Sequence, residues 1–189
     1  MPNSNRHAEL LRADDTLLVV VDMQEPFLRS IWEREKLTAN VTTLIRAANI
    51  LRVPIVPTLQ YASRMGDLAP EISKYIPKDR GAFDKMTFSC ACDEAFLSEL
   101  QRSGRKQVLL CGLETHICVN QTALDLVARD FQVVVAADAV SSRTESNYQI
   151  GLNRMEHAGV IISSTEMAIY EMLYEAGTPD FREILSLIK

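Results

Sequence analysis

The chain has 189 residues, of which 47% are hydrophobic and 24% are charged, a composition typical of a globular protein with one well-buried core. Its formal net charge of −5 argues against a protein that holds a nucleic-acid backbone. The first residues lack the apolar core of a signal peptide, and no apolar run is long enough to cross a membrane. We therefore expect a cytoplasmic protein without a membrane or nucleic-acid partner.

Apolar runs alternate with segments of helical periodicity along the chain. Six runs have the length and β-branched content of strands, at residues 16–21, 55–59, 83–86, 107–111, 132–137 and 160–163. Helical spacing covers residues 37–51, 93–103, 115–130, 145–158 and 165–174, and an amphipathic stretch follows at 181–188. This alternation predicts a three-layer α/β/α fold with a mostly parallel sheet of six strands. We expect a single domain over residues 1–189, with its core between about residues 16 and 174.

One long polar segment separates the second and third predicted strands. Residues 60–84 contain Pro70 and Pro77 and have only weak periodicity, apart from a short helix expected near residues 71–75. Segments of this length inside a compact domain are usually functional loops. We expect this one to cover a binding site.

Two aspartates and one turn follow predicted strands directly. Asp22 follows residues 16–21, Asp138 follows residues 132–137, and the turn 112–118 follows residues 107–111. The carboxyl ends of parallel strands lie at one edge of the sheet, where ligands bind in such folds. Asp22 is therefore a candidate for chemistry, although an aspartate in its position also commonly caps a turn, here the one before Pro26.

Cys118 is placed in or near the first turn of the helix predicted after that turn. Unpaired backbone N–H groups and the positive end of the helix dipole favour a thiolate there, as a nucleophile requires. The alternative is that Cys118 is inert and buried, as most unpaired cysteines are. The four cysteines, at 90, 92, 111 and 118, have no metal-finger or C-x-x-C spacing, and we expect reduced thiols rather than a disulfide framework.

Several common site motifs are missing from the sequence. It has no glycine-rich phosphate loop and no G-x-S-x-G serine elbow. The histidines, at 7, 116 and 157, lack metal-ligand spacing. We therefore expect neither a metal nor another cofactor. Lys85, considered alone, is most simply a solvated side chain.

Three ordered segments nevertheless resemble the isochorismatase-like cysteine hydrolases. The segment Leu-Val-Val-Val-Asp22-Met-Gln-Glu-Pro-Phe resembles the opening signature of that family, and Phe-Asp-Lys85-Met-Thr-Phe-Ser resembles its lysine segment. Gly-Leu-Glu-Thr-His-Ile-Cys118-Val resembles its nucleophile turn. The sequence at residues 114–118, 138–143 and 164–166 is most similar to that of the branch called isochorismatase domain-containing proteins.

The resemblance implies an isochorismatase-like, Rossmann-like hydrolase fold with a catalytic triad of Asp22, Lys85 and Cys118. Asp22 would take the thiol proton and later give it to the leaving amine. Lys85 would lower the thiol pKa and keep the carboxylate ionised. A cis peptide is implied at Leu113–Glu114, with the backbone N–H groups of Glu114 and Cys118 forming an oxyanion hole.

The sequence departs from the metal-dependent members of the family. Their Asp-x-His motif is replaced by Thr58-Leu-Gln-Tyr-Ala-Ser. We therefore predict a metal-independent cysteine hydrolase that cleaves a small amide or ureide C–N bond through a Cys118 thioester. Weaker candidates for the substrate-binding wall are Phe27, Trp32, Gln60, Tyr61 and His116.

Two other classes of function compete with this hydrolase. The first is an interaction or scaffold protein with a vestigial site, using the 60–84 loop and the C-terminal amphipathic stretch for its partners. The second is a nuclease, which the acidic charge and the lack of clustered Lys and Arg with interleaved aromatics argue against. The resemblance also implies a homo-oligomer, and the Ile184–Ile188 stripe requires cover.

Overall fold

A sheet of six parallel strands runs through the computed structural model, which describes residues 6–188. Its spatial order is β3-β2-β1-β4-β5-β6, and each strand pairs in parallel with its neighbours. The strands are β1 Thr16–Val21, β2 Ile55–Gln60, β3 Phe83–Lys85, β4 Gln107–Leu113, β5 Gln132–Ser141 and β6 Ile161–Ser163. The three-layer parallel fold predicted from the sequence is thereby confirmed. The predicted domain limits, residues 1 and 189, lie outside the described residues.

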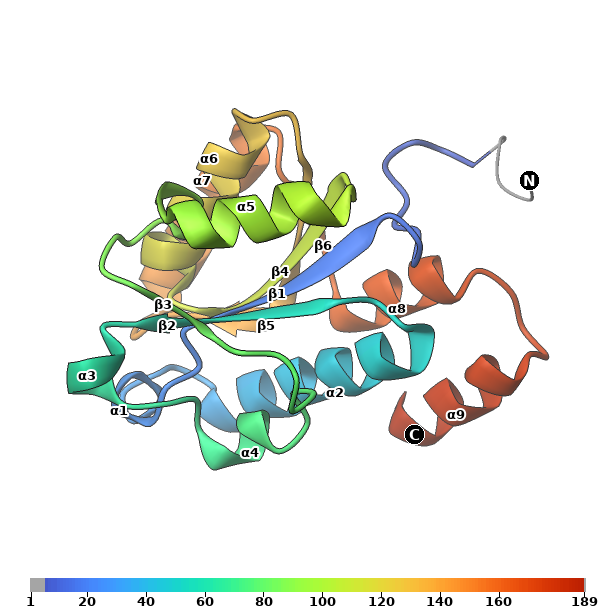
Figure 1. Cartoon of the computed structure of the whole chain (residues 1–189), viewed down its shortest axis with the longest axis horizontal. Coiled ribbons are helices and arrows are strands. Elements are labelled where there is room, and N and C mark those ends of the chain that lie inside the picture. Colours follow the sequence, from blue (N-terminus) through green and yellow to red (C-terminus); the bar gives the residue numbers. More distant parts are fainter. Residues whose placement is uncertain (1–5, 189) are drawn as a thin grey trace.

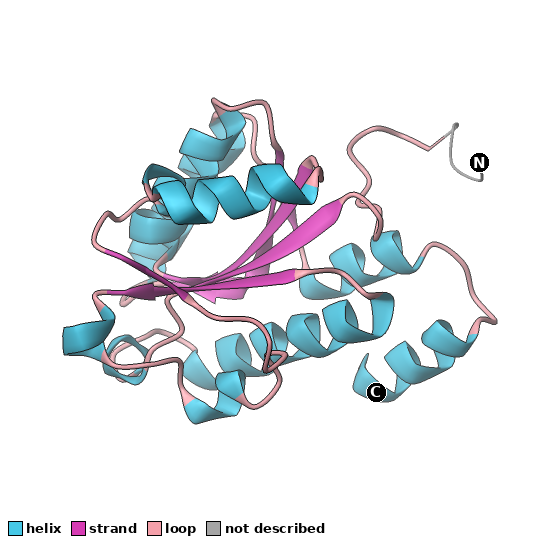
Figure 2. Ribbon diagram, viewed as in Figure 1, coloured by secondary structure: helices cyan, strands magenta, loops and turns pink. Residues whose placement is uncertain are grey.

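Helices cover both faces of the sheet (Figures 1 and 2). The helices on one face are α5 Glu94–Ser103, α6 Asn120–Val127 and α7 Glu145–His157. The main helices on the other face are α2 Arg34–Leu51, α8 Thr165–Leu173 and α9 Pro179–Ile188. None of the helices described between residues 6 and 188 has the length and apolar character needed to cross a membrane.

The position of β1 between two helical layers explains the apolar run at residues 17–21. Leu18 and Val20 belong to the hydrophobic cluster that contains the α2 side chains, whereas Leu17 and Val19 belong to the cluster on the α5 side. Successive side chains of a strand point to opposite faces, so a strand between two helical layers must be apolar at every position. All six residues of β1 are buried.

The strand order places a switch point between β1 and β4. The chain runs outward from β1 through β2 to β3, and then outward on the other side from β4 through β5 to β6. Open parallel sheets bind ligands at such a point, outside the carboxyl ends of the strands. The short helices α1 Glu25–Leu28 and α3 Ala62–Met65 lie at this end of the sheet, at the left in Figure 1.

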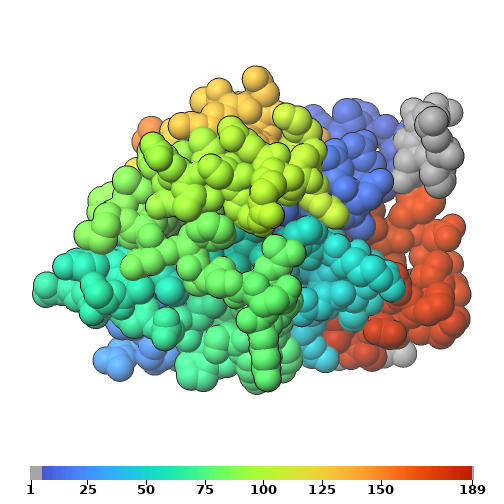
Figure 3. Space-filling view, viewed as in Figure 1, coloured from blue at the N-terminus to red at the C-terminus, as the bar shows by residue number. Residues whose placement is uncertain are grey.

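The polar segment between β2 and β3 is more ordered than the sequence indicates. It contains α3 and α4 Pro70–Ser73, the latter close to the short helix predicted at residues 71–75. The backbone N–H of Ala69 donates to the carbonyl of Met23, and Gln24 forms an antiparallel bridge with Leu68. The segment is therefore tied to the chain just after β1. It spreads across the front of the molecule in Figure 3, in teal and green.

Two sequence predictions on the β5 and α9 side need correction. β5 does not end before Asp138 but continues to Ser141, with an irregularity opposite Leu110 to Gly112. The Asp138 carboxylate accepts bonds from the backbone and hydroxyl of Thr165 at the start of α8, so Asp138 anchors a helix. The C-terminal stripe is already covered, because α9 packs on α2 and Ile184 is fully buried.

Gly112 is where β1 and β4 approach each other most tightly. Its φ is +109°, and a Cβ built there would lie 2.2 Å from the carbonyl oxygen of Val21. We expect Gly112→Ala to lower the free energy of unfolding by about 3 kcal/mol or more, because backbone must move to relieve the clash. Urea denaturation measures the loss.

Gly104 provides the matched control. It also has a positive φ, +69°, but an added Cβ would meet nothing within 4 Å. Gly104→Ala should cost only about 1 kcal/mol, the price of the left-handed conformation. Equal losses in the two variants would contradict the close approach of β1 and β4 as the reason for the glycine.

Candidate active site

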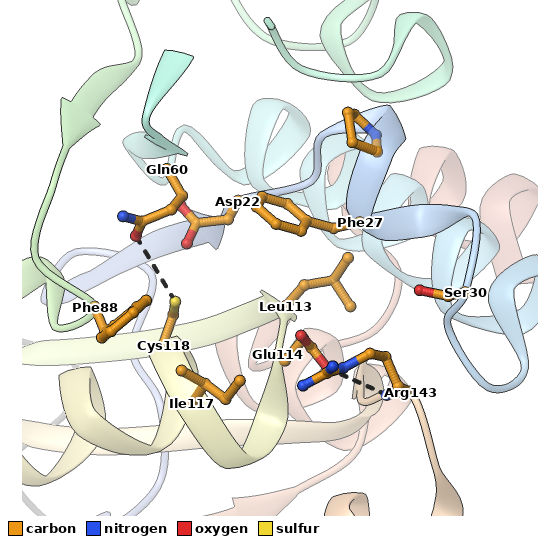
Figure 4. Close-up of a pocket in the computed structure, with 11 residues that line it drawn as sticks. Asp22, Phe27, Ser30, Gln60, Phe88, Leu113, Glu114, Ile117, Cys118 and Arg143 are labelled. Atoms are coloured by element: carbon orange, nitrogen blue, oxygen red, sulfur yellow. Dashed lines mark hydrogen bonds and ion pairs between the residues drawn. The ribbon is translucent and has the colours of Figure 1, made fainter. Parts of the chain in front are cut away.

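A pocket of about 260 Å³ opens at the switch point, between the ends of β1 and β4 (Figure 4). Its lining residues are Asp22, Pro26, Phe27, Ser30, Gln60, Phe88, Leu113, Glu114, Ile117, Cys118 and Arg143. In Figure 4, Cys118, Gln60 and Asp22 gather at one end, and Glu114 and Arg143 lie at the other. Phe27 and Leu113 lie between the two ends, so an apolar part of the wall separates the two groups of polar side chains.

Asp22 is held in one orientation at the floor of this pocket. Its backbone has a φ of +48°, and its side chain is 2% exposed. The Thr58 hydroxyl donates to Oδ1 at 2.7 Å, and the Lys85 ammonium donates to Oδ2 at 2.8 Å. The Asp22 backbone N–H donates in turn to the Thr58 hydroxyl oxygen. The carboxyl group is therefore buried and fixed at both oxygens.

Lys85, at the end of β3, crosses beneath the end of β2 to reach Asp22. Its Nζ donates to Asp22 Oδ2 at 2.8 Å, to Gln60 Oε1 at 2.6 Å and to the Thr87 carbonyl at 3.3 Å. Burial lowers the pKa of Lys85, but its interactions with Cys90, Asp22 and Cys118 outweigh that effect and raise the pKa overall. The side chain, 1% exposed, is thus a buried cation and not the solvated lysine that its residue type alone suggests.

Cys118 lies in a π-helical turn, Thr115–Val119, that joins β4 to α6. Its side chain is 7% exposed, and its Sγ is 4.0 Å from Gln60 Oε1. Burial raises the pKa of the Cys118 thiol, and Asp22 raises it further, while Lys85 lowers it. The net direction is upward.

The prediction of a low thiol pKa was therefore wrong. The sequence places Cys118 at the start of a helix but cannot show how little water reaches it, and here desolvation outweighs the charge of Lys85. Asp22 and Lys85 both act on the ionisation of this thiol, in opposite directions.

The turn before Cys118 is fixed by Glu114. The Leu113–Glu114 peptide bond is cis. The Glu114 carbonyl accepts from the backbone of Ile117 and Val119, and its carboxylate accepts from the backbone N–H and the Nε of Arg143. The ends of β4 and β5 are thereby joined at the mouth of the pocket, where Figure 4 marks the Glu114–Arg143 pair.

The weaker sequence candidates are divided by the structure. Phe27 and Gln60 line the pocket. Tyr61 is 38% exposed, at the start of α3, and is not part of the lining. The His116 ring bonds the Ser142 hydroxyl at 2.9 Å, and Trp32 packs against Tyr148, both away from this lining. Tyr61 lies just after β2, at the start of α3, and His116 lies in the π-helical turn with Cys118, but neither side chain lines the pocket.

Sequence reasoning missed Thr58, Cys90, Phe88 and Arg143. Thr58 carries the only recoverable signal, since it is a hydroxyl residue inside the otherwise apolar run Ile-Val-Pro-Thr-Leu. Cys90 donates to the Thr58 hydroxyl at 3.8 Å and is fully buried, and burial raises its pKa to about 11. All four cysteines are free thiols. Within residues 6–188, no cluster of three or more His, Cys, Asp or Glu side chains could hold a metal ion.

The family model of the isochorismatase domain matches residues 16–167, which include Asp22, Lys85 and Cys118. The chain belongs to the isochorismatase family. Two of its relatives are the secreted isochorismatase effector Isc1 of Phytophthora sojae and isochorismatase domain-containing protein 2 of Danio rerio. The first is 41% identical, over 92% of this chain and 84% of the relative. The second is 33% identical, over 94% and 89%.

Solved structures of the same fold extend the comparison. The structure of MAR1 ribonuclease from Caenorhabditis elegans is 32% identical and matches with a TM-score of 0.89, covering 94% of this chain and 91% of that one. The YcaC gene product of Escherichia coli, described as an octameric hydrolase of unknown specificity, also matches with a TM-score of 0.89. It is 23% identical and covers 97% and 92% of the two chains, a likeness of fold alone.

The bond from Thr58 to Asp22 should be measurable in the stability of the protein. Thr58→Val keeps the shape of the side chain but leaves the buried carboxylate without its hydroxyl donor. We expect the free energy of unfolding to fall by about 2–3 kcal/mol, because the lost bond is to a charged group. Thr58→Ser, which keeps the hydroxyl and loses a methyl, should cost about 1 kcal/mol. Urea denaturation at neutral pH compares the two, and a valine variant at least as stable as the serine variant would contradict the assignment.

Proposed function

We propose that this protein is a metal-independent cysteine hydrolase that cleaves the C–N bond of a small amide or ureide through a thioester on Cys118. Membership in the isochorismatase family supports a hydrolase role. The observation that carries the finer proposal is the buried Lys85–Asp22 ion pair beside a thiol at the floor of a small pocket. A thiol that lines the pocket, a carboxyl group that can move its proton and a buried cation beside them are groups that acyl transfer can use.

The proposed reaction begins with a neutral thiol. As Cys118 Sγ attacks the carbonyl carbon, its proton passes to Asp22, and the C=O electron pair moves to oxygen. We assign the backbone N–H groups of Glu114 and Cys118 as donors to that oxyanion. Asp22 then gives the proton to the leaving nitrogen as the C–N bond breaks, leaving an amine or ammonia and an acyl thioester.

Water completes the cycle in the same site. Asp22 takes a proton from a water molecule as the oxygen of that water attacks the carbonyl carbon of the thioester. The C–S bond breaks, and that proton returns to the sulfur, so the products are a carboxylic acid and the free thiol. Asp22 thereby carries the thiol proton to the leaving nitrogen and the water proton to the leaving sulfur.

Lys85 contributes charge and not a proton in this scheme. Its three N–H groups already have three acceptors, Asp22, Gln60 and the Thr87 carbonyl. Its positive charge favours the ionised carboxylate and lowers the cost of the developing thiolate. The raised pKa of Lys85 keeps it protonated throughout the neutral range.

The walls of the pocket limit the substrate class. Five lining residues are apolar: Pro26, Phe27, Phe88, Leu113 and Ile117. A volume of about 260 Å³ holds a small molecule and not a folded chain. We propose a small amide with an apolar portion, its carbonyl carbon at Cys118.

A ribonuclease is the second candidate, because the C. elegans structure carries that name. The net charge of −5 and the small volume of the pocket argue against RNA as a substrate. RNA cleavage that is lost in Cys118→Ala would establish it over the amidase. RNA that stays intact with the wild-type protein would exclude it.

We also propose a homo-oligomer in the cytoplasm. The exposed large apolar residues include Met86 and Phe88 just after β3 and Ile150 and Met167 on α7 and α8, and the E. coli neighbour is described as octameric. Four free thiols fit a reducing compartment, although the P. sojae relative is named as secreted. Light scattering should give a multiple of the chain mass of 21.2 kDa, and a value equal to that mass would refute oligomerisation.

Replacing the nucleophile tests the reaction directly. With ammonia release measured over a panel of small aliphatic and aromatic amides, we expect Cys118→Ala to lower kcat/KM by a factor of about 1,000 or more, since Cys118 is the only one of the four cysteines that lines the pocket. Cys92→Ala is the matched control, because Cys92 is exposed and lies outside the pocket, and it should retain wild-type rates. Amide turnover that survives in Cys118→Ala would refute the thioester. If no amide is cleaved and a stable complex with another protein forms equally well in Cys118→Ala, the scaffold interpretation is correct.

A further inference from the structure

Gln60 occupies an unusual position for a residue that would only line a pocket. Its side-chain oxygen, Oε1, accepts from Lys85 Nζ at 2.6 Å, the shortest of the three bonds that the ammonium makes. The same oxygen lies 4.0 Å from Cys118 Sγ, the contact drawn as a dashed line in Figure 4. A single amide oxygen is therefore shared between the buried cation and the thiol.

The orientation of this amide is fixed by its other end. Gln60 Nε2 donates to the Met86 carbonyl at 3.0 Å, which leaves Oε1 directed at Lys85. Gln60 and Lys85 also lie opposite each other in the register of β2 and β3. The amide nitrogen can donate but cannot accept, so a reversed amide would place N–H groups against an ammonium and lose both bonds.

The backbone of Gln60 is held by a second glutamine. Gln24 Oε1 accepts from the Gln60 N–H at 2.8 Å, and Gln24 Nε2 donates to the Gln60 carbonyl at 3.2 Å and to the Gly66 carbonyl at 2.7 Å. Gln24 is fully buried and lies two residues after Asp22. The side chain of Gln24 therefore binds β2 in the way that a neighbouring strand would.

These contacts form a closed loop. Asp22 is continuous in sequence with Gln24, which holds Gln60, which holds Lys85, which binds Asp22. We propose that Gln60 is a positioning residue that fixes the Lys85 ammonium beside Asp22 and Cys118 and thereby sets how readily the thiol ionises. The proposal rests on the proposed function for its significance, because it concerns the proposed nucleophile, but the thiol can be titrated without a substrate.

The groups that face the thiol are few. Asp22 and Cys90 disfavour its ionisation, and Lys85 favours it. Lys85 in turn faces Asp22, Cys90 and Cys118. Glu114, the other carboxylate of the pocket, is paired with Arg143. A change at Gln60 therefore acts on Cys118 mainly through the position of the single neighbouring cation.

The test is a titration of Cys118 in two variants of nearly equal side-chain size. The rate at which iodoacetamide alkylates Cys118, read from the mass of its peptide, is recorded against pH for each protein, because only the thiolate reacts and the rate follows the thiolate fraction well below the pKa. Gln60→Met removes the acceptor for Lys85, so the cation is held less closely to the thiol. At a given pH on the rising part of the curve, we expect about one third of the wild-type thiolate or less.

Gln60→Glu tests whether a charge at this position reaches the thiol. It retains an oxygen for Lys85 but adds a negative charge beside the thiol, so the curve should move to still higher pH than in Gln60→Met. Ser63→Ala, an exposed change in α3, should leave the curve in place. Thermal unfolding of each protein confirms that the folded state is the one titrated.

A curve that is unchanged or moved to lower pH in either Gln60 variant would overturn the proposal. Failure of the amidase proposal would look different. If no amide is hydrolysed but the titration moves as expected, Gln60 still positions Lys85. If amides are hydrolysed through Cys118 and the titration is unmoved, only the role of Gln60 is refuted.

Discussion

Lys85 and Asp22 carry opposite charges 2.8 Å apart in a part of the protein that water hardly reaches. Burying such ions has a large desolvation cost, which is offset only when geometry and further hydrogen bonds are favourable. Here the Thr58 hydroxyl donates a second hydrogen bond to the carboxylate, and Gln60 Oε1 and the Thr87 carbonyl accept hydrogen bonds from the ammonium. Removing one partner of a buried pair typically costs about 3–5 kcal/mol, because the other is left uncompensated. The buried ion pair is therefore stable only where the fold supplies these hydrogen-bond partners. It also links the ends of β1, β2 and β3.

The other half of the site comes from the far side of the switch point. Gly112 lets β4 approach β1 closely, and the π-turn after Glu114 then places Cys118 against the ion pair. Arg143, just after β5, binds the Glu114 carboxylate at the pocket mouth. Short contacts at strand ends thus position the thiol beside the buried carboxyl group of Asp22. The raised pKa of Cys118 gives this arrangement a clear role, since a buried neutral thiol needs a nearby base, and Asp22 is that base in our account.

Much of the fold can be predicted from the sequence, because the period of its apolar residues directly reflects burial. The six strands lie where their apolar runs predict, and the parallel order follows from strand–helix alternation. The site is less accessible to such reasoning. Asp22 and Cys118 follow from their places at strand ends, but Lys85 stands out only through family resemblance, because nothing local shows that its side chain crosses β2. The ionisation of Cys118 was predicted in the wrong direction since desolvation is a property of the packed structure. Asp138 was misplaced because an irregular strand continues past it.

Detection of an acyl group on Cys118 tests the central claim most directly. The protein is mixed with p-nitrophenyl acetate, an activated ester that delivers an acetyl group to a competent thiol, quenched in acid within the first turnover and digested for mass spectrometry. Our account predicts a burst of about one nitrophenol per site and one acetyl group on the Cys118 peptide, both lost in Cys118→Ala. Nitrophenol release without a burst, with the Cys118 peptide unmodified and the same rate in Cys118→Ala, would contradict a thioester mechanism for this protein.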